Sequence, residues 1–229
     1  TAKLKGGAIY NEGTINDING DFIANKMTNT TTDSDGGTIY NGGNGKINSI
    51  HGNFNGNTAA GSGAAVKNSG EIGNISANFI GNYADKDGGA IYNDINKKIG
   101  DVTGDFIGNS VGDYGGAVYA KKGAVFGKIR GNFLNNSAQT AGGAIYNLSN
   151  MTFASGGDTY FMSGNYTNKV SHGKIYNALL SNTTSEVTFD TSGGGAWVIN
   201  DNLRNGIYKF VGDGTPDADN GTTAQYVAV

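Results

Sequence analysis

Residues 88–109 read GGAIYNDINKKIGDVTGDFIGN and contain two motifs that recur along the chain. The first motif, Gly-Gly-Ala-Ile-Tyr-Asn or a variant of it, begins at positions 6, 36, 63, 88, 115, 142 and 172. The second motif, Phe-x-x-Asn or a close variant, begins at positions 22, 54, 79, 106 and 133. The chain is therefore built from repeats of about 25 to 30 residues, a period that indicates a repeat architecture.

Each repeat holds three short apolar segments, because a pair such as Ile99 and Val102 lies between the two motifs. Short segments rich in Ile, Val, Phe and Tyr, separated by Gly, Asn, Asp and Ser, favour strands over helices. A propeller blade needs four antiparallel strands and about 40 residues, whereas three strands in about 27 residues fit one coil of a parallel β-helix. We predict an all-β fold, a right-handed single-stranded parallel β-helix with three short strands per coil and about seven coils; the handedness follows the general rule for parallel crossovers.

Stacked coils place equivalent residues of successive repeats above one another. Two apolar rows are therefore expected inside the coil. One consists of Phe22, Phe54, Phe79, Phe106 and Phe133, and the other of Ile9, Ile39, Val66, Ile91, Val118, Ile145 and Ile175. The residues before each Phe, in order Asp21, Asn53, Asn78, Asp105 and Asn132, agree with stacking because no two carboxylates become neighbours. Asn residues that close the motifs are expected at turns, hydrogen-bonded along the axis.

Side chains alternate on a strand, so Ile inside predicts that the neighbouring Tyr points outward. The predicted exposed row consists of Tyr10, Tyr40, Tyr92, Tyr119, Tyr146 and Tyr176, interrupted by Lys67. The opposite phase, with Ala and Tyr inside, is the alternative. An exposed aromatic row is the candidate partner-binding surface, and rings that merely stack on one another are the alternative role.

Two regions are expected along the chain: regular coils over residues 1–177, and less regular continuing coils over residues 178–229 that are truncated. Strands are predicted at 151–153, 159–162, 186–189, 197–200, 206–212 and 222–229. The last strand has no polar cap of the kind that ends a solenoid. We interpret the chain as a slice of a longer precursor.

Composition excludes several classes of protein. A net charge of −3 with scattered basic residues argues against a nucleic-acid partner. The absence of Cys excludes disulfides and thiolate metal sites. No apolar run reaches the ~18 residues that a membrane-spanning segment needs. The 40 glycines are expected in turns rather than in a disordered chain, because aromatic and β-branched residues recur regularly between them.

No constellation of residues points to catalysis, a cofactor or a metal. His51 and His172 are isolated, and neither Arg130 nor Arg204 has a carboxylate cluster nearby in sequence. Acids precede three Gly-Gly turns, and we interpret them as solvated turn residues rather than as a calcium site. These acids are Asp33, Asp35, Asp85, Asp87 and Asp113. We predict a protein that is not an enzyme and that needs no cofactor.

The Gly-Gly-Ala-Ile and Phe-x-x-Asn motifs resemble the tetrapeptides of chlamydial polymorphic membrane proteins, within the wider group of bacterial autotransporter passenger domains. The segments at 197–203 and 208–214 also look like passenger sequence. The resemblance implies export and a place at the bacterial cell surface or outer membrane. It implies an adhesin or stalk that meets a host protein, a glycan or a neighbouring cell. Self-association into filaments through uncapped coils and a polysaccharide-acting enzyme are the alternatives.

Overall fold

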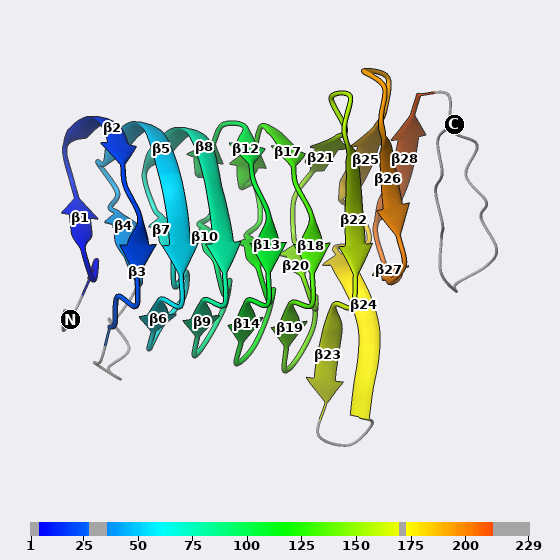
Figure 1. Ribbon diagram of the computed structural model, residues 1–229, viewed down its shortest axis with the longest axis horizontal. Helices are drawn as coiled ribbons and strands as arrows, with labels where there is room; N and C mark the ends of the chain where they lie inside the picture. The colour runs from blue at the N-terminus through cyan, green and yellow to red at the C-terminus, as the bar shows by residue number, and fades with distance from the viewer. Residues whose placement is uncertain (1–4, 28–35, 170–172, 213–229) are drawn as a thin grey trace.

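The computed structural model describes residues 5–27, 36–169 and 173–212, which form a row of stacked coils with the N-terminal coil at one end (Figure 1). The strands of successive coils pair in parallel and form three faces, so the predicted all-β parallel β-helix is confirmed. We name these faces the motif face, the long face and the short face.

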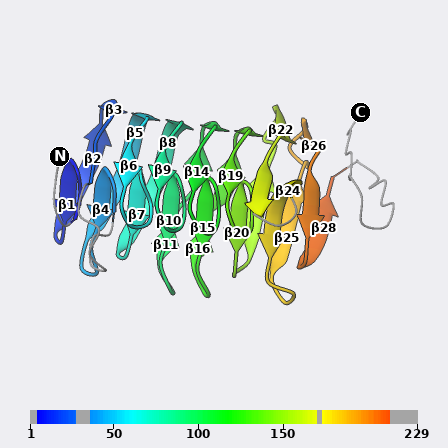
Figure 2. The same cartoon turned by 90° about the horizontal axis from the view of Figure 1, so that it is seen from below.

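The motif face contains the Gly-Gly-Ala-Ile-Tyr-Asn strands, which lie side by side along the rod (Figure 2). In chain order they are β1 (Ile9–Asn11), β4 (Ile39–Asn41), β7 (Val66–Asn68), β10 (Ile91–Asn93), β15 (Val118–Ala120), β20 (Ile145–Asn147), β24 (Gly173–Ser181) and β27 (Asn202–Arg204). Most coils turn into this face at a Gly-Gly pair. Gly88 has φ +62°, and a Cβ there would collide with the backbone oxygen of Ile91, so this position requires glycine.

The long face carries both the Ile pair and the Phe motif, which the sequence had suggested as separate strands. In two coils they form single strands of 10 residues, β5 (Lys46–Asn55) and β8 (Glu71–Ile80). In the other coils the face divides into β2 (Thr14–Asn19), β3 (Phe22–Ile23), β11 (Lys98–Ile99), β12 (Val102–Thr103), β13 (Phe106–Ile107), β16 (Val125–Phe126), β17 (Lys128–Arg130), β18 (Phe133–Leu134), β21 (Met151–Ala154), β22 (Thr159–Ser163), β25 (Glu186–Asp190), β26 (Ala196–Ile199) and β28 (Ile207–Val211).

The short face consists of the two residues that follow each Phe-x-x-Asn motif, and these were not predicted as strands. Its members are β6 (Thr58–Ala59), β9 (Tyr83–Ala84), β14 (Ser110–Val111), β19 (Ser137–Ala138) and β23 (Tyr166–Lys169). Such pairs of mostly small residues carry too little apolar signal to be recognised in a sequence. The third face of the coil is therefore a finding of the structure.

The predicted Phe row is confirmed. Ring centroids of successive members are 4.8, 5.2, 4.8 and 4.6 Å apart, and the ring planes differ by 11° or less. Phe54, Phe79, Phe106 and Phe133 have no exposed surface, whereas Phe22 in the first coil is partly buried. Full burial of such side chains contributes about 1.5–3 kcal/mol each, so this row is a main stabilising element.

The Ile row is confirmed up to Ile145, but its predicted last member is wrong. Leu179, not Ile175, pairs with Ile145. Ile175 pairs with Thr167 in an antiparallel hairpin between β23 and β24, which projects from the rod (Figure 1). This hairpin replaces the Gly-Gly corner and joins the motif and short faces into one continuous sheet.

Two rows of buried Asn run along the corners of the coil, as predicted. The Phe-x-x-Asn row contains Asn25, Asn57, Asn82, Asn109, Asn136 and Asn165, and it ends on Asp201. The Tyr-Asn row contains Asn11, Asn41, Asn68, Asn93 and Asn147, with Ala120 in the place between the last two. Each bond joins the Nδ2 of one Asn to an oxygen of the next residue in the row.

The strands predicted at 151–153, 159–162, 186–189, 197–200 and 206–212 are present as β21, β22, β25, β26 and β28, whereas 222–229 lies outside the described residues. In this region Met162, not a Phe, pairs with Phe133. A new stack forms instead, with centroids 5.1 Å apart between Phe153 and Phe189 and 5.4 Å between Phe189 and Phe210. The division of the chain at residue 177 stays a prediction.

Candidate functional site

The Tyr row has the predicted register in the first six coils but not the predicted exposure. Only Tyr10 is clearly exposed, at 51%. Tyr40, Tyr92 and Tyr119 are buried, with 7%, 4% and 9% of their surface exposed, and the prediction of an exposed row was wrong for these three. Tyr146 is half-buried.

The last predicted member of the row is also wrong. Tyr176 pairs with Tyr166 in the hairpin, and Leu180 takes the position next to Tyr146. Because of the hairpin, the strand rejoins the motif face four residues later than the sequence motif suggests. Leu180 therefore occupies the coil position that the motif assigns to Tyr176.

The Tyr rings are covered by each other and by lysine side chains. Ring centroids are 5.4 Å apart between Tyr10 and Tyr40 and 5.3 Å between Tyr92 and Tyr119. The Lys67 ammonium bridges the interruption, 5.8 Å from the Tyr40 centroid and 4.8 Å from the Tyr92 centroid. Cation–π and ring-stacking contacts of this kind stabilise the rod. Partner binding by the Tyr row stays a prediction. The central members Tyr40, Tyr92 and Tyr119 offer little ring surface to a partner, because they are buried.

Asp87 lies at the edge of this row and is not the solvated turn acid that we expected. One carboxylate oxygen, Oδ1, is buried without a hydrogen-bond partner among the described residues. Burial, and then the charge of Asp113, raise the pKa of Asp87 to about 6, while the Tyr114 amide and two lysines act in the opposite direction. Burial of Tyr119, and then the negative charge of Asp87, raise the pKa of Tyr119.

The remaining titratable candidates do not converge. Asp33 and Asp35 lie outside the described residues. Within the described ranges no group of three or more His, Asp or Glu side chains is arranged to hold a metal ion. Arg130 forms an ion pair of 3.2 Å with Asp101, which is distant in sequence but one coil away on the long face. A single, partly exposed ion pair of this type links two neighbouring coils at the surface and does not by itself indicate a catalytic site.

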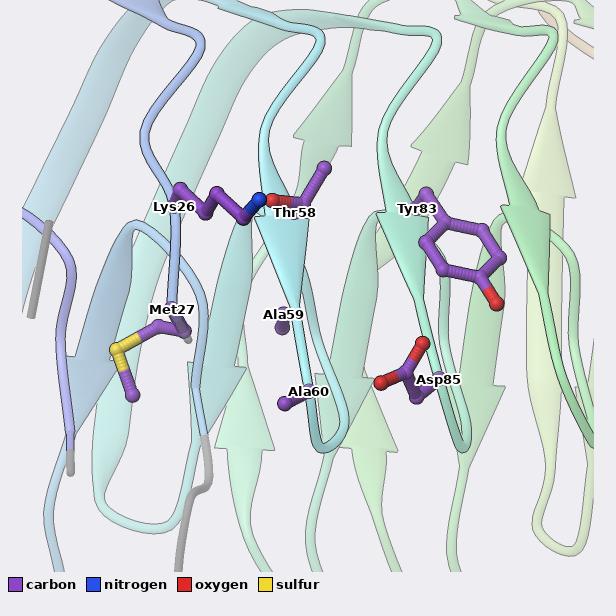
Figure 3. A pocket seen from close by; sticks show the side chains of 7 residues that line it. All are labelled: Lys26, Met27, Thr58, Ala59, Ala60, Tyr83 and Asp85. Atoms are coloured by element: carbon purple, nitrogen blue, oxygen red, sulfur yellow. The ribbon is translucent and has the colours of Figure 1, made fainter. Parts of the chain in front are cut away.

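A notch of about 370 Å³ lies on the short face of the described surface. It is lined by Lys26, Met27, Thr58, Ala59, Ala60, Tyr83 and Asp85. Figure 3 shows Lys26 extended toward Thr58 on one side, and the Tyr83 ring with the Asp85 carboxylate on the other. We name this hollow the Thr58 notch.

The Thr58 notch arises from the outward row of the short face. In order, this row contains Lys26, Thr58, Tyr83, Ser110, Ser137 and Tyr166. Thr58 is shorter than both of its neighbours, so the surface drops by the length of a side chain over one coil. Sequence reasoning missed the notch because the residues after each Phe-x-x-Asn share no residue type, so the short face was not recognised.

Comparison with known families gives a match over three stretches of the chain. Residues 76–94, 104–121 and 131–148 match the Chlamydia polymorphic membrane protein repeat. No curated protein and no solved structure matches the chain. Among the described residues no helix has the length and apolar character to cross a membrane. Each of the three stretches begins on the long face and ends with a Gly-Gly strand of the motif face, so the match follows the coils. Residues 76–148 therefore carry Chlamydia polymorphic membrane protein repeats, as the two motifs had predicted.

Proposed function

We propose that this chain is a non-catalytic segment of a surface-displayed passenger domain, whose rigid coil presents binding residues to a host protein or glycan. The Chlamydia polymorphic membrane protein repeats in residues 76–148 support this proposal. Export and a place at the bacterial cell surface or outer membrane are part of it.

The observation that carries the proposal is the contrast between inward and outward rows. Inward rows repeat one residue type, as the stacked Phe and Asn rows show. Exposed rows change from coil to coil, in contrast to the outward Tyr row, which its neighbours cover. The row that begins at Thr14 continues with Lys46, Glu71, Lys98 and Val125. A constant core with a variable surface is what a scaffold for recognition needs, because the surface can change without altering the fold.

The same contrast disfavours the two alternatives. An enzyme needs clustered groups of matched pKa in a cleft, and the ion pairs of the described surface are dispersed, as the pairs of Lys121 with Asp94 and of Lys209 with Glu186 illustrate. A filament needs end-to-end pairing of coils, which depends on strand edges rather than on variable outward rows.

Binding of the purified, labelled chain to epithelial cells tests the proposal. We expect saturable binding that unlabelled chain competes away. The double variant Ile80→Ser with Tyr83→Ser changes two exposed side chains and should keep the circular dichroism spectrum of the wild type. A loss of binding by this variant would therefore report on its surface and not on its fold. Absence of saturable binding would contradict the proposal, as would regular filaments in electron micrographs or depolymerisation of an added polysaccharide.

A further inference from the structure

The Thr58 notch has the dimensions of a site for one ring of a small ligand. Lys26 and Tyr83 lie on coils that flank the coil of Thr58. Parallel strands are spaced by about 4.8 Å, so the two backbones are about 10 Å apart. The volume of about 370 Å³ lies at the lower end of the range typical of ligand pockets, about 300–1,000 Å³.

The floor and one wall of the notch are apolar. Met27 and Ala59 form part of the floor, each with 3% of its surface exposed. The Tyr83 side chain forms a wall, and the residue is 41% exposed; among the aromatic residues whose burial is described, Tyr10 and Phe161 are the others in this exposed class. An exposed aromatic face over an apolar floor offers a surface on which the C–H face of a pyranose ring can stack.

Three polar groups border the same surface. The Tyr83 hydroxyl and the Asp85 carboxylate are two of them; burial, and then the nearby Asp85 carboxylate, raise the pKa of Tyr83. The Thr58 Oγ1 is buried and has no hydrogen-bond partner within the described residues. A buried hydroxyl without a partner is costly. A ligand hydroxyl reaches this oxygen once a covering side chain moves aside, and it would then recover the lost hydrogen bond.

Lys26 determines the charge of the ligand. Its side chain is exposed and lines the notch opposite Tyr83. Ion pairs of the described residues are formed by other lysines, such as Lys121 and Lys128. An ammonium group at one side and hydrogen-bonding groups at the other fit a ring that carries both a carboxylate and hydroxyls.

We propose that the Thr58 notch binds an acidic monosaccharide unit of a glycan, with the sugar ring on Tyr83, a hydroxyl at Thr58 and the sugar carboxylate at Lys26. This inference rests on the proposed function as a surface-displayed binding rod and adds the class of ligand. Hydroxyls of the sugar also reach the Asp85 carboxylate, which accepts hydrogen bonds.

Titration of the full chain with glucuronate, galacturonate and N-acetylneuraminate, followed by calorimetry or by ligand-observed NMR, tests the assignment. Glucose and galactose are the neutral probes. We expect at least one acidic sugar to bind more tightly than the neutral sugar of the same ring. Tyr83→Ala should weaken its binding by about tenfold, which corresponds to about 1.4 kcal/mol for the lost ring contact. Lys26→Gln should weaken the acidic sugar by about tenfold and leave neutral sugars unchanged.

Matched control variants are available on other faces. Tyr10→Ala removes an exposed tyrosine of the motif face, and Lys46→Gln removes an exposed lysine of the long face. Neither should alter sugar binding. The assignment is overturned if no acidic sugar binds at concentrations up to about 10 mM, if neutral sugars bind as tightly, or if the control variants weaken binding as much as the notch variants. Because these titrations use free sugars, failure here leaves cell binding by another surface intact.

Discussion

The two Asn rows stabilise opposite corners of the same coil in different ways. In the Phe-x-x-Asn row, both the backbone N–H and the Nδ2 of each Asn donate to the oxygen of the next member, at 2.9–3.0 Å for Asn82 and Asn109. Each Nδ2 also donates to a Phe carbonyl one coil back, as Asn109 does to Phe79 at 2.9 Å. The donors and the acceptor of each interior amide are therefore satisfied by the row itself.

In the Tyr-Asn row only the side chains are joined along the axis. Asn68 Nδ2 donates to Asn93 Oδ1 at 2.9 Å, while its own Oδ1 accepts from the Gly70 amide. The row stops at Ala120, where Asn93 Nδ2 keeps only its bonds to the carbonyls of Lys97 and Val125, equivalent to those that Asn41 Nδ2 makes to Gly45 and Glu71. The corner of the Phe-x-x-Asn row therefore depends on the row for its backbone hydrogen bonds. The corner of the Tyr-Asn row uses local turns and tolerates Ala120 in the place of an Asn.

Removal of one Asn from each row should therefore have unequal effects. Asn109→Ala leaves the backbone N–H and one Nδ2 proton of Asn82 without an acceptor in a buried site. Orphaned buried donors cost about 1–3 kcal/mol each, so we expect a loss of about 3–5 kcal/mol in the free energy of unfolding. Asn93→Ala orphans fewer groups and should cost about 1–3 kcal/mol. Denaturant-induced unfolding of both variants measures the difference, and equal losses would contradict the comparison.

The last acceptor of the Phe-x-x-Asn row should also contribute more to stability than the last acceptor of the Tyr-Asn row. Asp201 accepts from the amide N–H groups of Gly164 and Asn165 and from Asn165 Nδ2, whereas the Tyr-Asn row ends with one bond of 3.0 Å from Asn147 to the Ser181 hydroxyl. We expect Asp201→Ala to cost about 2–4 kcal/mol and Ser181→Ala about 1 kcal/mol. Hydrogen exchange of the Gly164 and Asn165 amides checks the first effect, because these two should lose protection.

Asp201→Asn is the conservative control for that experiment. An amide oxygen can still accept from Asn165, so this variant should lose less stability than Asp201→Ala. A loss as large as that of the alanine variant would show that the charge of Asp201, rather than its position as the last acceptor, stabilises the end of the row.

The parts of this fold that could be predicted are those in which one residue type recurs. The Phe row, the Asn rows and the strand segments were readable because stacking imposes the same requirement on each coil. The short face was not readable, since Ser110 and Val111 carry no motif of their own. Nor was the hairpin, since residues 172–177 resemble the Gly-Gly motif while β23 and β24 pair locally.

The exposure of the Tyr row failed for a different reason. Alternation along a strand correctly predicts that Tyr92 points away from the Ile row, but it does not predict what covers the outer surface. The rings of neighbouring coils, the Lys67 side chain and Tyr114 cover it; the Tyr114 ring lies 4.7 Å from the Tyr146 ring. Exposure at an outward position depends on residues far away in sequence, and so does the Thr58 notch.

Completion of the interrupted row sharpens the comparison. Ala120 has no exposed surface and lies between Asn93 and Asn147 in register. In Ala120→Asn, the new Oδ1 would accept from Asn93 and the new Nδ2 would donate to Asn147. We expect a gain of about 1 kcal/mol in the free energy of unfolding. A loss of stability would show that neighbouring side chains already fill the space, as overpacking does.

The acid that ends the Phe-x-x-Asn row should give that corner a dependence on pH that the Tyr-Asn row lacks. Burial raises the pKa of Asp201 more than its three N–H donors lower it. A folded-state pKa above the unfolded value means that the folded protein binds the proton more tightly. Stability therefore falls as the pH rises from the unfolded value through the raised one, and it stays constant above that range.

Asp87 is a second carboxylate whose pKa is raised by burial, so its contribution to the pH dependence of stability must be separated from that of Asp201. We expect its contribution to be the smallest of these changes in stability. The pKa of Asp87 is raised to about 6, chiefly by burial, so the wild type should gain stability as the pH is lowered from about 7 to about 5. In Asp87→Asn this gain should vanish, while the dependence that belongs to Asp201 persists. Denaturation midpoints between about pH 4 and pH 8 for the wild type, Asp87→Asn and Asp201→Asn distinguish the two carboxylates. An unchanged slope near pH 6 in Asp87→Asn would show that this carboxylate is solvated in the folded protein, and the covering of the Tyr row by its neighbours would then be looser than the packing indicates.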